Sequence, residues 1–289
     1  MHIRPATAAD MAAVHDCWLA TDFTDPSEYA AMAALGIAPW WPHLYEHGHL
    51  LVAEADGLIV GLAGTQTRGR ICYLADCFVR PEWQSHGIAK ALLAQLHTDT
   101  TLIHCTLASG DRRAVSRYLR AGMVPRWPMY FLATTDVTRI AAPQLTVTVC
   151  TDVDAWMHHD RQFLGFDRRV DIDHFFVGST GAVLLQLFAG TQLVGQAVVQ
   201  KRRYDLSPLD KRNIGPVAAF DVAYAAAVLQ STVAWAVADG AVSASLRVPA
   251  EHPGLAVLLD CGMQISDVET FCASEEWFDP RCYAPSGIL

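Results

Sequence analysis

One segment near the middle of the first half combines the residue types that bind a phosphate group. It runs Cys77-Phe78-Val79-Arg80-Pro81-Glu82-Trp83-Gln84-Ser85-His86-Gly87-Ile88-Ala89-Lys90-Ala91-Leu92-Leu93. We expect a strand to end before Pro81, a loop to follow, and a helix to begin at Gly87. The free N–H groups of a first helical turn, with the positive end of the helix dipole, form an anion site. Gly87 and Ala89 are small enough to let a phosphate approach the backbone. An ordinary strand–loop–helix joint is the alternative interpretation.

A second informative segment follows, and it is rich in arginine. It runs Ala108-Ser109-Gly110-Asp111-Arg112-Arg113-Ala114-Val115-Ser116-Arg117-Tyr118-Leu119-Arg120-Ala121-Gly122-Met123. Its pattern predicts a helix over 112–121 that Gly122 ends. The basic residues of the two segments either lie near bound phosphates or form a solvated helix face, and the sequence leaves both open. These residues are Lys90, Arg112, Arg113 and Arg117.

Together the two segments resemble motifs A and B of the GCN5-related N-acetyltransferase (GNAT) superfamily. Motif A is Val-x-Pro followed by Arg/Gln-x-x-Gly-x-Gly/Ala, and its positions are filled here by Val79, Pro81, Gln84, Gly87 and Ala89. Motif B is Asn-x-x-Ala before a Tyr and a Gly-Phe, and its matching residues are Ala114, Tyr118 and Gly122. Asp111 stands where the family has Asn, which puts an amide contact to the coenzyme in doubt, and Met123 replaces Phe.

The resemblance implies an enzyme that uses acetyl-CoA as a co-substrate and holds no metal. The loop amides would hold the coenzyme's pyrophosphate, and the preceding strand would hydrogen-bond pantetheine through its backbone. The coenzyme-binding residues that it implies are Cys77, Phe78, Val79, Gln84, Ser85, His86, Gly87, Ile88, Ala89, Lys90 and Asp111. Tyr118 would protonate the departing CoA thiolate. Its alternative role is that of a core aromatic residue facing the sheet.

The acceptor amine of such a reaction must be neutral before it can attack. At pH 7 a lysine-like amine is neutral in only about one molecule in 2,500, so a base would relieve part of the barrier. Asp76, beside the expected pantetheine strand, is our candidate base, with a structural strand-end acid as the alternative. Glu46, His47 and His49 are further candidates, which an ordinary polar turn also explains.

Hydrophobic patterning and turn signals predict the elements that carry these residues. Asp56-Gly57 between two apolar runs predicts a hairpin, and Thr7 with Asp10 predicts a helix start. The expected strands are Ile3–Ala6, Leu50–Ala55, Leu58–Gln66, Arg70–Val79, Leu102–Ala108 and Met129–Ala133. The expected helices are Met11–Leu19, Ile88–His97 and Arg112–Ala121.

The second half repeats this order, which indicates a duplicated unit. Its expected strands are Thr146–Cys150, Val183–Phe188, Leu193–Gln200, Asn213–Phe220, Val242–Val248 and Ile265–Ala273, and its helices begin at Val153, Asp221 and Pro253. Three landmarks pair in order: Gly61 with Gly195, Pro81 with Pro216, and Ala121-Gly122-Met123 with Cys261-Gly262-Met263. We therefore predict two domains, residues 1–138 and 145–289, with the boundary near Thr134–Gln144.

The second half does not keep motif A. Asp221 at its helix start would repel a pyrophosphate, and Leu258 and Leu259 occupy the neighbourhood that corresponds to Tyr118. We expect a GNAT-like fold without its own coenzyme. It resembles the C-terminal GNAT-like domain found behind some bacterial acetyltransferase domains, through Phe163–Arg168, Gly195 and Ile214–Ala218. This resemblance implies a wall of the acceptor pocket in which Asp167, Asp171 and Asp173 suit a cationic amine, whereas a turn with a surface ion pair is the alternative.

Composition excludes several other classes of protein. The chain has 289 residues, of which 52% are hydrophobic and 18% charged, so it is not disordered. A net charge of −9 argues against a nucleic-acid binder or a protein held on an anionic membrane. We find no membrane span and no secretion signal. The eight cysteines form no CxxC pair, which argues against zinc and disulfides and favours a cytoplasmic location.

The sequence thus predicts an α/β (α+β) protein of two tandem GNAT folds, each a mixed, mostly antiparallel sheet flanked by helices. The expected function is an acyl-CoA-dependent N-acyltransferase that moves acetyl from acetyl-CoA to an amine, either a cationic small molecule or a peptide amine. A longer acyl donor, a non-catalytic acyl-CoA sensor and a pseudoenzyme scaffold are the alternatives. The last two are disfavoured because motif A is intact and Tyr118 is present. The sequence names neither the acceptor nor an oligomeric state.

Overall fold

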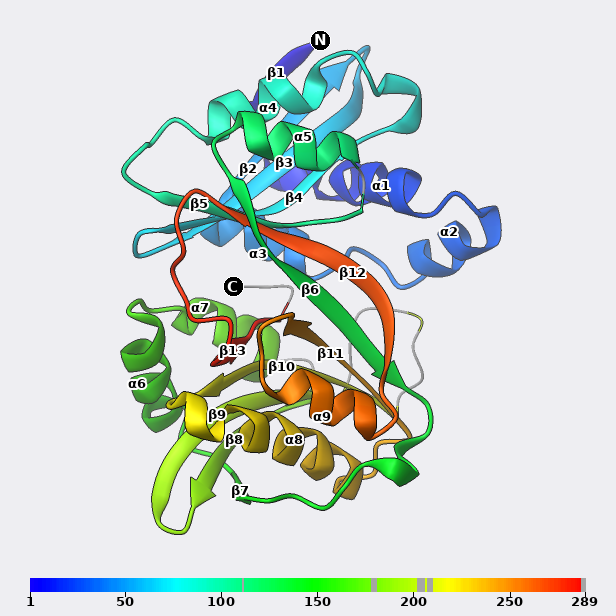
Figure 1. Cartoon of the computed structure of the whole chain (residues 1–289). Helices are drawn as coiled ribbons and strands as arrows, with labels where there is room; N and C mark the ends of the chain where they lie inside the picture. The colour runs from blue at the N-terminus through cyan, green and yellow to red at the C-terminus, as the bar shows by residue number, and fades with distance from the viewer. Residues whose placement is uncertain (111, 178–180, 202–205, 207–209, 287–289) are drawn as a thin grey trace.

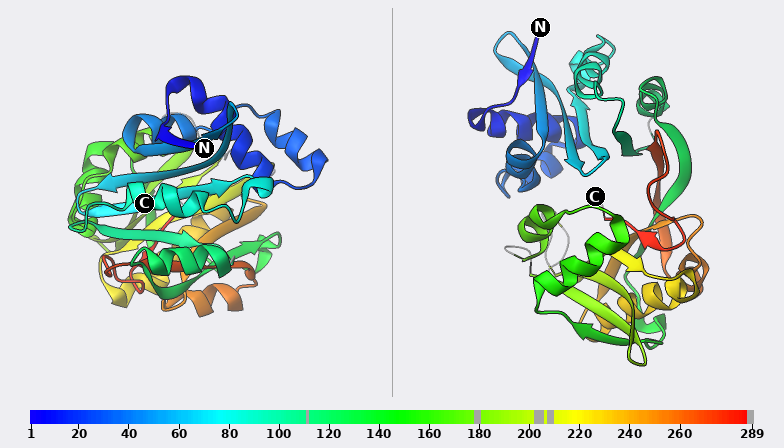
Figure 2. Two further views of the ribbon diagram at one scale, coloured as in Figure 1. Left: turned by 90° about the horizontal axis from the view of Figure 1, so that it is seen from above. Right: turned by 90° about the vertical axis from the view of Figure 1, so that its left-hand side faces the viewer.

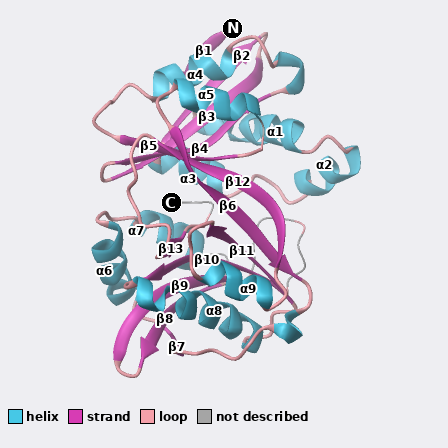
Figure 3. Cartoon of the chain, viewed as in Figure 1, coloured by secondary structure: helices cyan, strands magenta, loops and turns pink. Residues whose placement is uncertain are grey.

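The computed structural model describes residues 1–110, 112–177, 181–201, 206 and 210–286. Within these residues the chain forms one continuous sheet of thirteen strands with helices on its two faces (Figures 1 and 3). The predicted α/β class with a mostly antiparallel sheet is confirmed. The two predicted GNAT units share this sheet rather than forming two separate sheets.

The first half supplies the elements that carry the two motifs. Its strands are β1 (His2–Pro5), β2 (His49–Ala55), β3 (Leu58–Arg68), β4 (Ile71–Val79), β5 (Ile103–Ala108) and β6 (Val124–Thr134). Its helices are α1 (Met11–Asp22), α2 (Pro26–Ala33), α3 (Trp40–His47), α4 (Ile88–Leu96) and α5 (Arg112–Arg120), with the short helical turn η2 (Pro81–Trp83) before α4.

The second half repeats the order and adds a short last strand. Its strands are β7 (Thr146–Val149), β8 (Ala182–Ala189), β9 (Gln192–Gln200), β10 (Lys211–Ala219), β11 (Ser243–Pro249), β12 (Gln264–Ala273) and β13 (Tyr283–Ala284). Its helices are α6 (Val153–Leu164), α7 (Arg169–Ile172), the π-helical turn η4 (Asp173–Val177), α8 (Val222–Ala238) and α9 (Gly254–Asp260).

The two halves exchange their last long strands. The sheet order is β1-β2-β3-β4-β5-β12-β6-β11-β10-β9-β8-β7, with β13 paired to β10. Strand β12 of the second half therefore pairs with β5 of the first, while β6 of the first half pairs with β11 of the second. Figures 1 and 2 show β6 and β12 running side by side between the two lobes, where they also pair with each other. Each lobe is thus completed by a strand from the other half.

Apolar residues pack the helices against both faces of the sheet. In the first half one core joins the sheet to α1, α2 and α3, and another joins it to α4 and α5. In the second half α8 and α9 share one core with the sheet, while α6, α7 and η4 share another. This repeats the same layering in both lobes, as a duplicated unit requires.

Two of the three predicted repeat landmarks are confirmed by the structure. Gly61 pairs with Val79 and Gly195 pairs with Ala219 at the same place in the two sheets. At each glycine a Cβ would meet both the adjacent strand and the next helix at 3.2 Å or less. The other match places Gly122 and Gly262 after α5 and α9, both with positive φ. After each of these glycines, the N–H of the next residue, Met123 or Met263, donates to the carbonyl oxygen five residues earlier.

The third landmark, Pro81 with Pro216, is wrong. Pro81 lies after β4, whereas Pro216 lies inside β10 beside a bulge. Because Val79 and Ala219 are equivalent, the position that matches Pro81 is Asp221. The spacing between Pro81 and Pro216 in the sequence resembles the spacing of the repeat only by chance.

Candidate active site

The turn between β4 and α4 has the backbone geometry expected of a phosphate cradle. Ser85 and Gly87 have φ of 67° and 79°, and Gly87 is the residue immediately before α4. A Cβ at Gly87 would meet nothing within 4 Å, so the space beside this backbone is open. The first turn of a helix leaves its N–H groups without carbonyl partners in the helix. Ser85, His86, Gly87 and Lys90 are exposed while Ile88 and Ala89 are buried, so the turn is anchored from inside and open outside.

Gln84 fastens this turn to the neighbouring elements. Its side-chain amide donates to the carbonyl oxygen of Val79 at 3.1 Å, and its oxygen accepts from Arg113 at 3.0 Å. The predicted Gln84 thus braces the loop against β4 and α5. Arg113 and Arg117 line the adjacent cleft, whereas Lys90 and Arg112 are exposed and do not line it. Asp111 lies outside the described residues.

Strands β4 and β5 separate partway along their length. Among the residues that the structure describes, they pair in parallel only through Ile71–Tyr73 and Ile103–Cys105, and beyond Tyr73 the edge of β4 that faces β5 has no strand partner. We call this gap the first opening. Arg80 N–H donates to Val60 on β3 at 3.0 Å, and successive N–H groups of an antiparallel strand alternate sides. The N–H of Val79 therefore points into the first opening, where an extended amide-bearing chain can pair with it.

A cleft of about 860 Å³ extends from the first opening to the strands of the second half. Asp76, Cys77, Phe78, Val79, Gln84 and Tyr118 of the predicted site all line it. It is large enough for a pantetheine arm and a small acceptor, since ligand pockets commonly measure about 300–1,000 Å³. The first-half prediction therefore converges on one place in the fold.

Tyr118 lies at the base of this cleft on α5. It is 8% exposed, and burial, followed by the nearby Cys77 and Cys272 thiols, raises the pKa of its phenol well above its ordinary value. The hydroxyl thus stays protonated at neutral pH and can give a proton to a leaving group. The equivalent residue of the second half is Leu258, because Met123 and Met263 donate to the carbonyls of Tyr118 and Leu258.

Two carboxylates face the same cleft. Asp76 on β4 is half-buried, and its pKa is raised to about 7 by burial and by the negative charge of Asp22. Asp22 ends α1 and accepts a hydrogen bond from the Trp18 indole at 2.6 Å; desolvation raises the pKa of Asp22 although that hydrogen bond lowers it. The carboxylate also sits at the negative end of the helix dipole. Two like charges at this point favour binding of a cation between them.

The sequence did not reveal the remaining walls of the cleft. An aromatic wall comes from Trp18, Trp40, Phe175 and Phe176, and a polar wall from the second half comes from Lys211, Asn213, Ser245, Arg247 and Glu269. Arg247 is fixed there by Glu269 at 3.3 Å and by the Phe131 ring at 4.0 Å. The nine wall residues are scattered over six elements and follow no motif, so only the fold brings them together.

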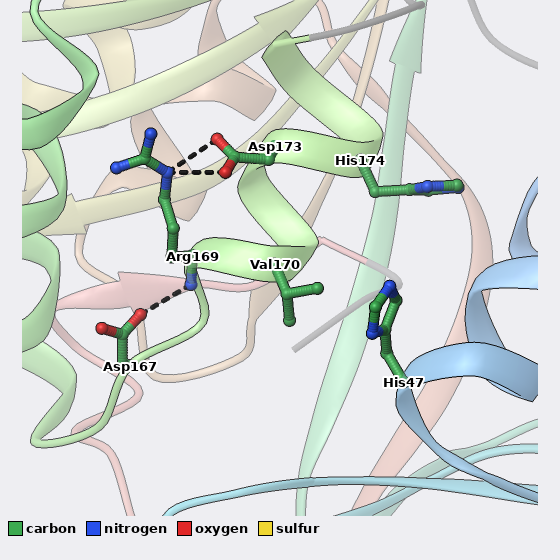
Figure 4. Close-up of a pocket in the computed structure, with 6 residues that line it drawn as sticks. All are labelled: His47, Asp167, Arg169, Val170, Asp173 and His174. Atoms are coloured by element: carbon green, nitrogen blue, oxygen red, sulfur yellow. Dashed lines mark hydrogen bonds and ion pairs between the residues drawn. The ribbon is translucent and has the colours of Figure 1, made fainter.

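The three aspartates expected at the acceptor pocket do not reach the cleft, and that expectation is wrong. Figure 4 shows Asp167 and Asp173 around a separate surface hollow with Arg169, which donates to both. Asp167 also pairs with Arg161 at 3.0 Å, which is the surface ion pair of the alternative interpretation. His47 borders the same hollow, and neither Glu46 nor His49 lines the cleft.

Asp171 is buried and serves the packing between the halves. His43 on α3 contacts its carboxylate at 2.7 Å, and Arg68 on β3 donates to both of its oxygens. Burial would raise the pKa of Asp171, but the hydrogen bonds from His43 and Arg68 outweigh it and lower the pKa. Asp171 therefore connects α7 to the first half through a hydrogen bond with His43 and an ion pair with Arg68. These partners compensate its charge, so it is not available to an amine.

Other features of the described residues bear on the class of protein. They include no group of three or more histidine, cysteine, aspartate or glutamate side chains arranged to hold a metal ion. All eight cysteines are free thiols in the part of the chain that the structure covers. Across those same residues, no helix is long and apolar enough to cross a membrane.

Comparison with known proteins agrees with this geometry. Residues 42–126, which run from within α3 to the start of β6, match the family model described as an acetyltransferase (GNAT) domain. No curated protein matches the chain. The first half therefore carries a GNAT acetyltransferase domain, which supports an acyl-CoA-dependent N-acyltransferase function.

Solved structures extend the likeness in fold to the whole chain. A Pyrococcus horikoshii protein proposed to be an acetyltransferase is 15% identical with a TM-score of 0.71, covering 99% of this chain and 94% of that one. A tandem GNAT protein from the clavulanic acid biosynthesis pathway is 14% identical with a TM-score of 0.59, covering 95% and 99%. A GCN5-related N-acetyltransferase from Sphaerobacter thermophilus is 14% identical with a TM-score of 0.57, covering 96% and 97%. At these identities the likeness establishes the tandem GNAT fold alone.

Proposed function

We propose that the chain transfers an acetyl group from acetyl-CoA to a cationic amine within the cleft between its halves. The observation that carries the proposal is the convergence, on one cleft, of an open phosphate cradle at Gly87, the unpaired edge of β4 and the buried hydroxyl of Tyr118. Bound acetyl-CoA supplies an activated acyl group as a thioester. The residues of the chain orient this group and move protons.

The predicted residues that the structure describes each have a definite task in this proposal. The amides of Ser85–Lys90 hold the pyrophosphate, with Gln84 bracing the loop and Arg113 beside it. The edge of Cys77–Val79 pairs with pantetheine. Holding a thioester and an amine in register can remove roughly 7–11 kcal/mol of the barrier. The proposed catalytic unit is residues 1–138, and residues 145–289 form the wall on the acceptor side.

Two groups handle protons on opposite sides of the reaction. The acceptor arrives as an ammonium ion, which the paired charges of Asp22 and Asp76 attract. Asp76 takes its proton, since a pKa of about 7 suits a base at neutral pH. The C–S bond breaks as the new C–N bond forms, and Tyr118 donates its proton to the departing thiolate. The second proton, which the nitrogen loses as it becomes an amide, restores the Tyr118 phenol through solvent. A small molecule fits the volume of the cleft, and a peptide amine is the second candidate. The cytoplasmic location stays a prediction from the sequence.

We expect Asp76→Asn to lower kcat/KM for the amine about a hundredfold at pH 8. The reason is that asparagine cannot accept the ammonium proton. In the native chain, protonation of Asp76 at low pH removes the base, so kcat/KM falls as pH drops through about 7. A pH–rate profile in which the variant keeps this acidic limb would exclude Asp76 as the group responsible.

Asp22→Asn is a companion variant that tests the neighbouring carboxylate in the same cleft. It removes the like charge that helps to raise the pKa of Asp76, so the acidic limb of the profile should move to lower pH. Binding of the cationic amine should weaken at the same time, which appears as a higher KM. Acetyl-CoA affinity is the internal standard, because neither aspartate touches the phosphate cradle.

We predict that the chain binds one acetyl-CoA. Between Val79 and α4 the first half has residues 80–87, which form the cradle, whereas between Ala219 and α8 the second half has only residues 220–221. Asp221 caps α8 by accepting from the Ala223 N–H at 2.8 Å, so a carboxylate occupies the helix end that would bind a phosphate. Titration calorimetry should give a stoichiometry of one. A value of two would contradict the assignment of a single coenzyme site.

A further inference from the structure

The second half contains an opening equivalent to the first opening, although it has no phosphate cradle. Strands β10 and β11 pair in parallel only through Lys211–Ile214 and Ser243–Leu246, and then separate. Phe220 N–H donates to Val194 at 2.9 Å, as Arg80 does to Val60 in the first half. The N–H of Ala219 thus points into the second opening, just as the N–H of Val79 points into the first.

Strand β13 fills this second opening. It pairs antiparallel with β10, with Ala284 opposite Val217 and Tyr283 opposite Ala218. The N–H of Ala219 donates to the carbonyl oxygen of Cys282 at 2.8 Å. β13 also contacts β11 on the far side of the gap. The backbone of the C-terminal segment therefore occupies the position that we assign to pantetheine in the first half.

A buried ionic network fixes β13 in this place. Tyr283 is fully buried, and its hydroxyl accepts from Arg168 at 2.8 Å. Arg168 donates to both carboxylate oxygens of Asp160 at 2.8 and 2.7 Å, and Gln196 donates to the same carboxylate at 3.1 Å. Buried charges are held only when they are paired and hydrogen-bonded. Arg168, the last residue of the segment Phe163–Arg168 that carried the second-half resemblance, thus anchors β13.

The anchored segment leads directly to the catalytic cleft. Ser286, three residues beyond Tyr283, lines the cleft together with Gly215 of β10. A Cβ on Gly215 would lie 3.7 Å from backbone atoms of Pro285 and Ser286, so the two segments are in close contact. The position of β13 therefore sets the position of part of the acceptor wall.

We propose that β13 is a built-in occupant of the second opening, where it makes the backbone hydrogen bonds that a coenzyme makes in the first. It keeps the second opening shut to ligands and holds β10 and Ser286 as a fixed wall for the acceptor. Arg168 and Tyr283 are positioning residues in this arrangement. The role assigned to the first opening rests on the proposed function, whereas the filling of the second opening does not.

Amide hydrogen exchange on the full chain tests this directly. Without ligand, the Ala219 amide should exchange about a hundredfold more slowly than the equivalent Val79 amide, because among the described residues Ala219 has a partner across its opening and Val79 has none. Acetyl-CoA should slow Val79 and leave Ala219 unchanged. Fast exchange at Ala219, or protection there that appears only with acetyl-CoA, would overturn the inference. If acetyl-CoA leaves the exchange rate of the Val79 amide unchanged, the proposed coenzyme site would be contradicted instead.

Tyr283→Phe, with the exposed Tyr45→Phe as control, tests the positioning role. Loss of one hydrogen bond to a buried charge should speed exchange at Ala219 about tenfold. It should also raise the KM of the amine that an acetyl-CoA thiol-release panel selects, while acetyl-CoA affinity stays unchanged. If Tyr283 had a purely structural role, the substitution would lower the stability of the protein but would not raise the KM of the amine selectively over the affinity for acetyl-CoA. Equal KM values for the variant and the control would overturn the role of β13 in the acceptor wall.

Discussion

Replacement of Gly87 by aspartate is expected to abolish measurable acetyl-CoA binding. The new carboxylate would stand in the open space beside the first turn of α4, where the pyrophosphate approaches. Two unit charges about 4 Å apart repel by roughly 4 kcal/mol near a protein surface. Since each 1.4 kcal/mol is a factor of ten, affinity should fall roughly a thousandfold. Titration calorimetry with acetyl-CoA measures the loss.

Gly165→Asp is a suitable control for this substitution. Gly165 has φ of 78° against 79° for Gly87, and a Cβ at either residue would meet nothing within 4 Å. Both variants therefore carry the same backbone strain, of about 1–2 kcal/mol, and the same added charge. Gly165 follows α6 in the second half, so its variant should bind acetyl-CoA normally. Unchanged affinity in a folded Gly87→Asp protein would refute the assignment of motif A.

Tyr118→Phe should lower turnover about a hundredfold at pH 7 while leaving acetyl-CoA affinity almost unchanged. The substitution removes only the hydroxyl, so the packing of α5 against the sheet survives. The raised pKa of Tyr118 keeps its proton available at all assay pH values, so the native enzyme does not lose its acid as pH rises. Single-turnover kinetics with saturating acetyl-CoA would separate this chemical effect from binding.

The loss caused by Tyr118→Phe should shrink with increasing pH. A free thiol has a pKa of about 8.5, so above that value the thiolate leaves without needing a proton donor. The ratio of native to variant turnover should therefore decline between pH 7 and 9. A variant with full turnover at pH 7 would make Tyr118 a core aromatic residue, and water would then be the proton donor.

The sequence predicted most elements of the fold because their signals are local. The hairpin at Asp56-Gly57, the helices expected to begin at Val153 and Asp221, and the helix after Gly87 all form within a residue of the expected start. Strand β6 is longer than predicted, because Pro125 and Pro128 argue against a strand. Those prolines lie where β6 pairs only with β12, since its pairing with β11 begins at Met129. One edge of the strand therefore needs no N–H donors there.

Helix α3 was missed for a related reason. Pro42 lies inside Trp40–His47, and proline normally interrupts a helix. At the third residue it falls within the first turn, where the N–H would have no partner in any case. The exchange of β6 and β12 could not be predicted from pattern, because a strand that pairs within its own half and one that pairs across halves bury the same residues.

The candidate site was predictable only where function resides in contiguous sequence. Gln84–Lys90 and the strand before it form the cradle and the first opening because a single strand–turn–helix unit positions them. The acceptor side is assembled from Asp22, Trp40, Phe175, Arg247 and others, which only the tertiary fold brings to one cleft. Asp167 and Asp171 were expected there because the resemblance to a C-terminal GNAT-like domain implied an acceptor wall in which their charges suit a cationic amine. Arginine partners already neutralise both of them.

The proposed function requires the cleft to transfer an acyl group rather than merely to bind acyl-CoA. The most direct measurement incubates the chain with acetyl-CoA and a panel of primary amines and follows both CoA thiol release and acetylated amine by mass spectrometry. We predict amine-dependent thiol release with one acetylated product per thiol, strongest for cationic small molecules and reduced about a hundredfold in Tyr118→Phe. Stoichiometric binding of acetyl-CoA with no amine acetylated by the native chain would contradict the account and identify a non-catalytic acyl-CoA sensor.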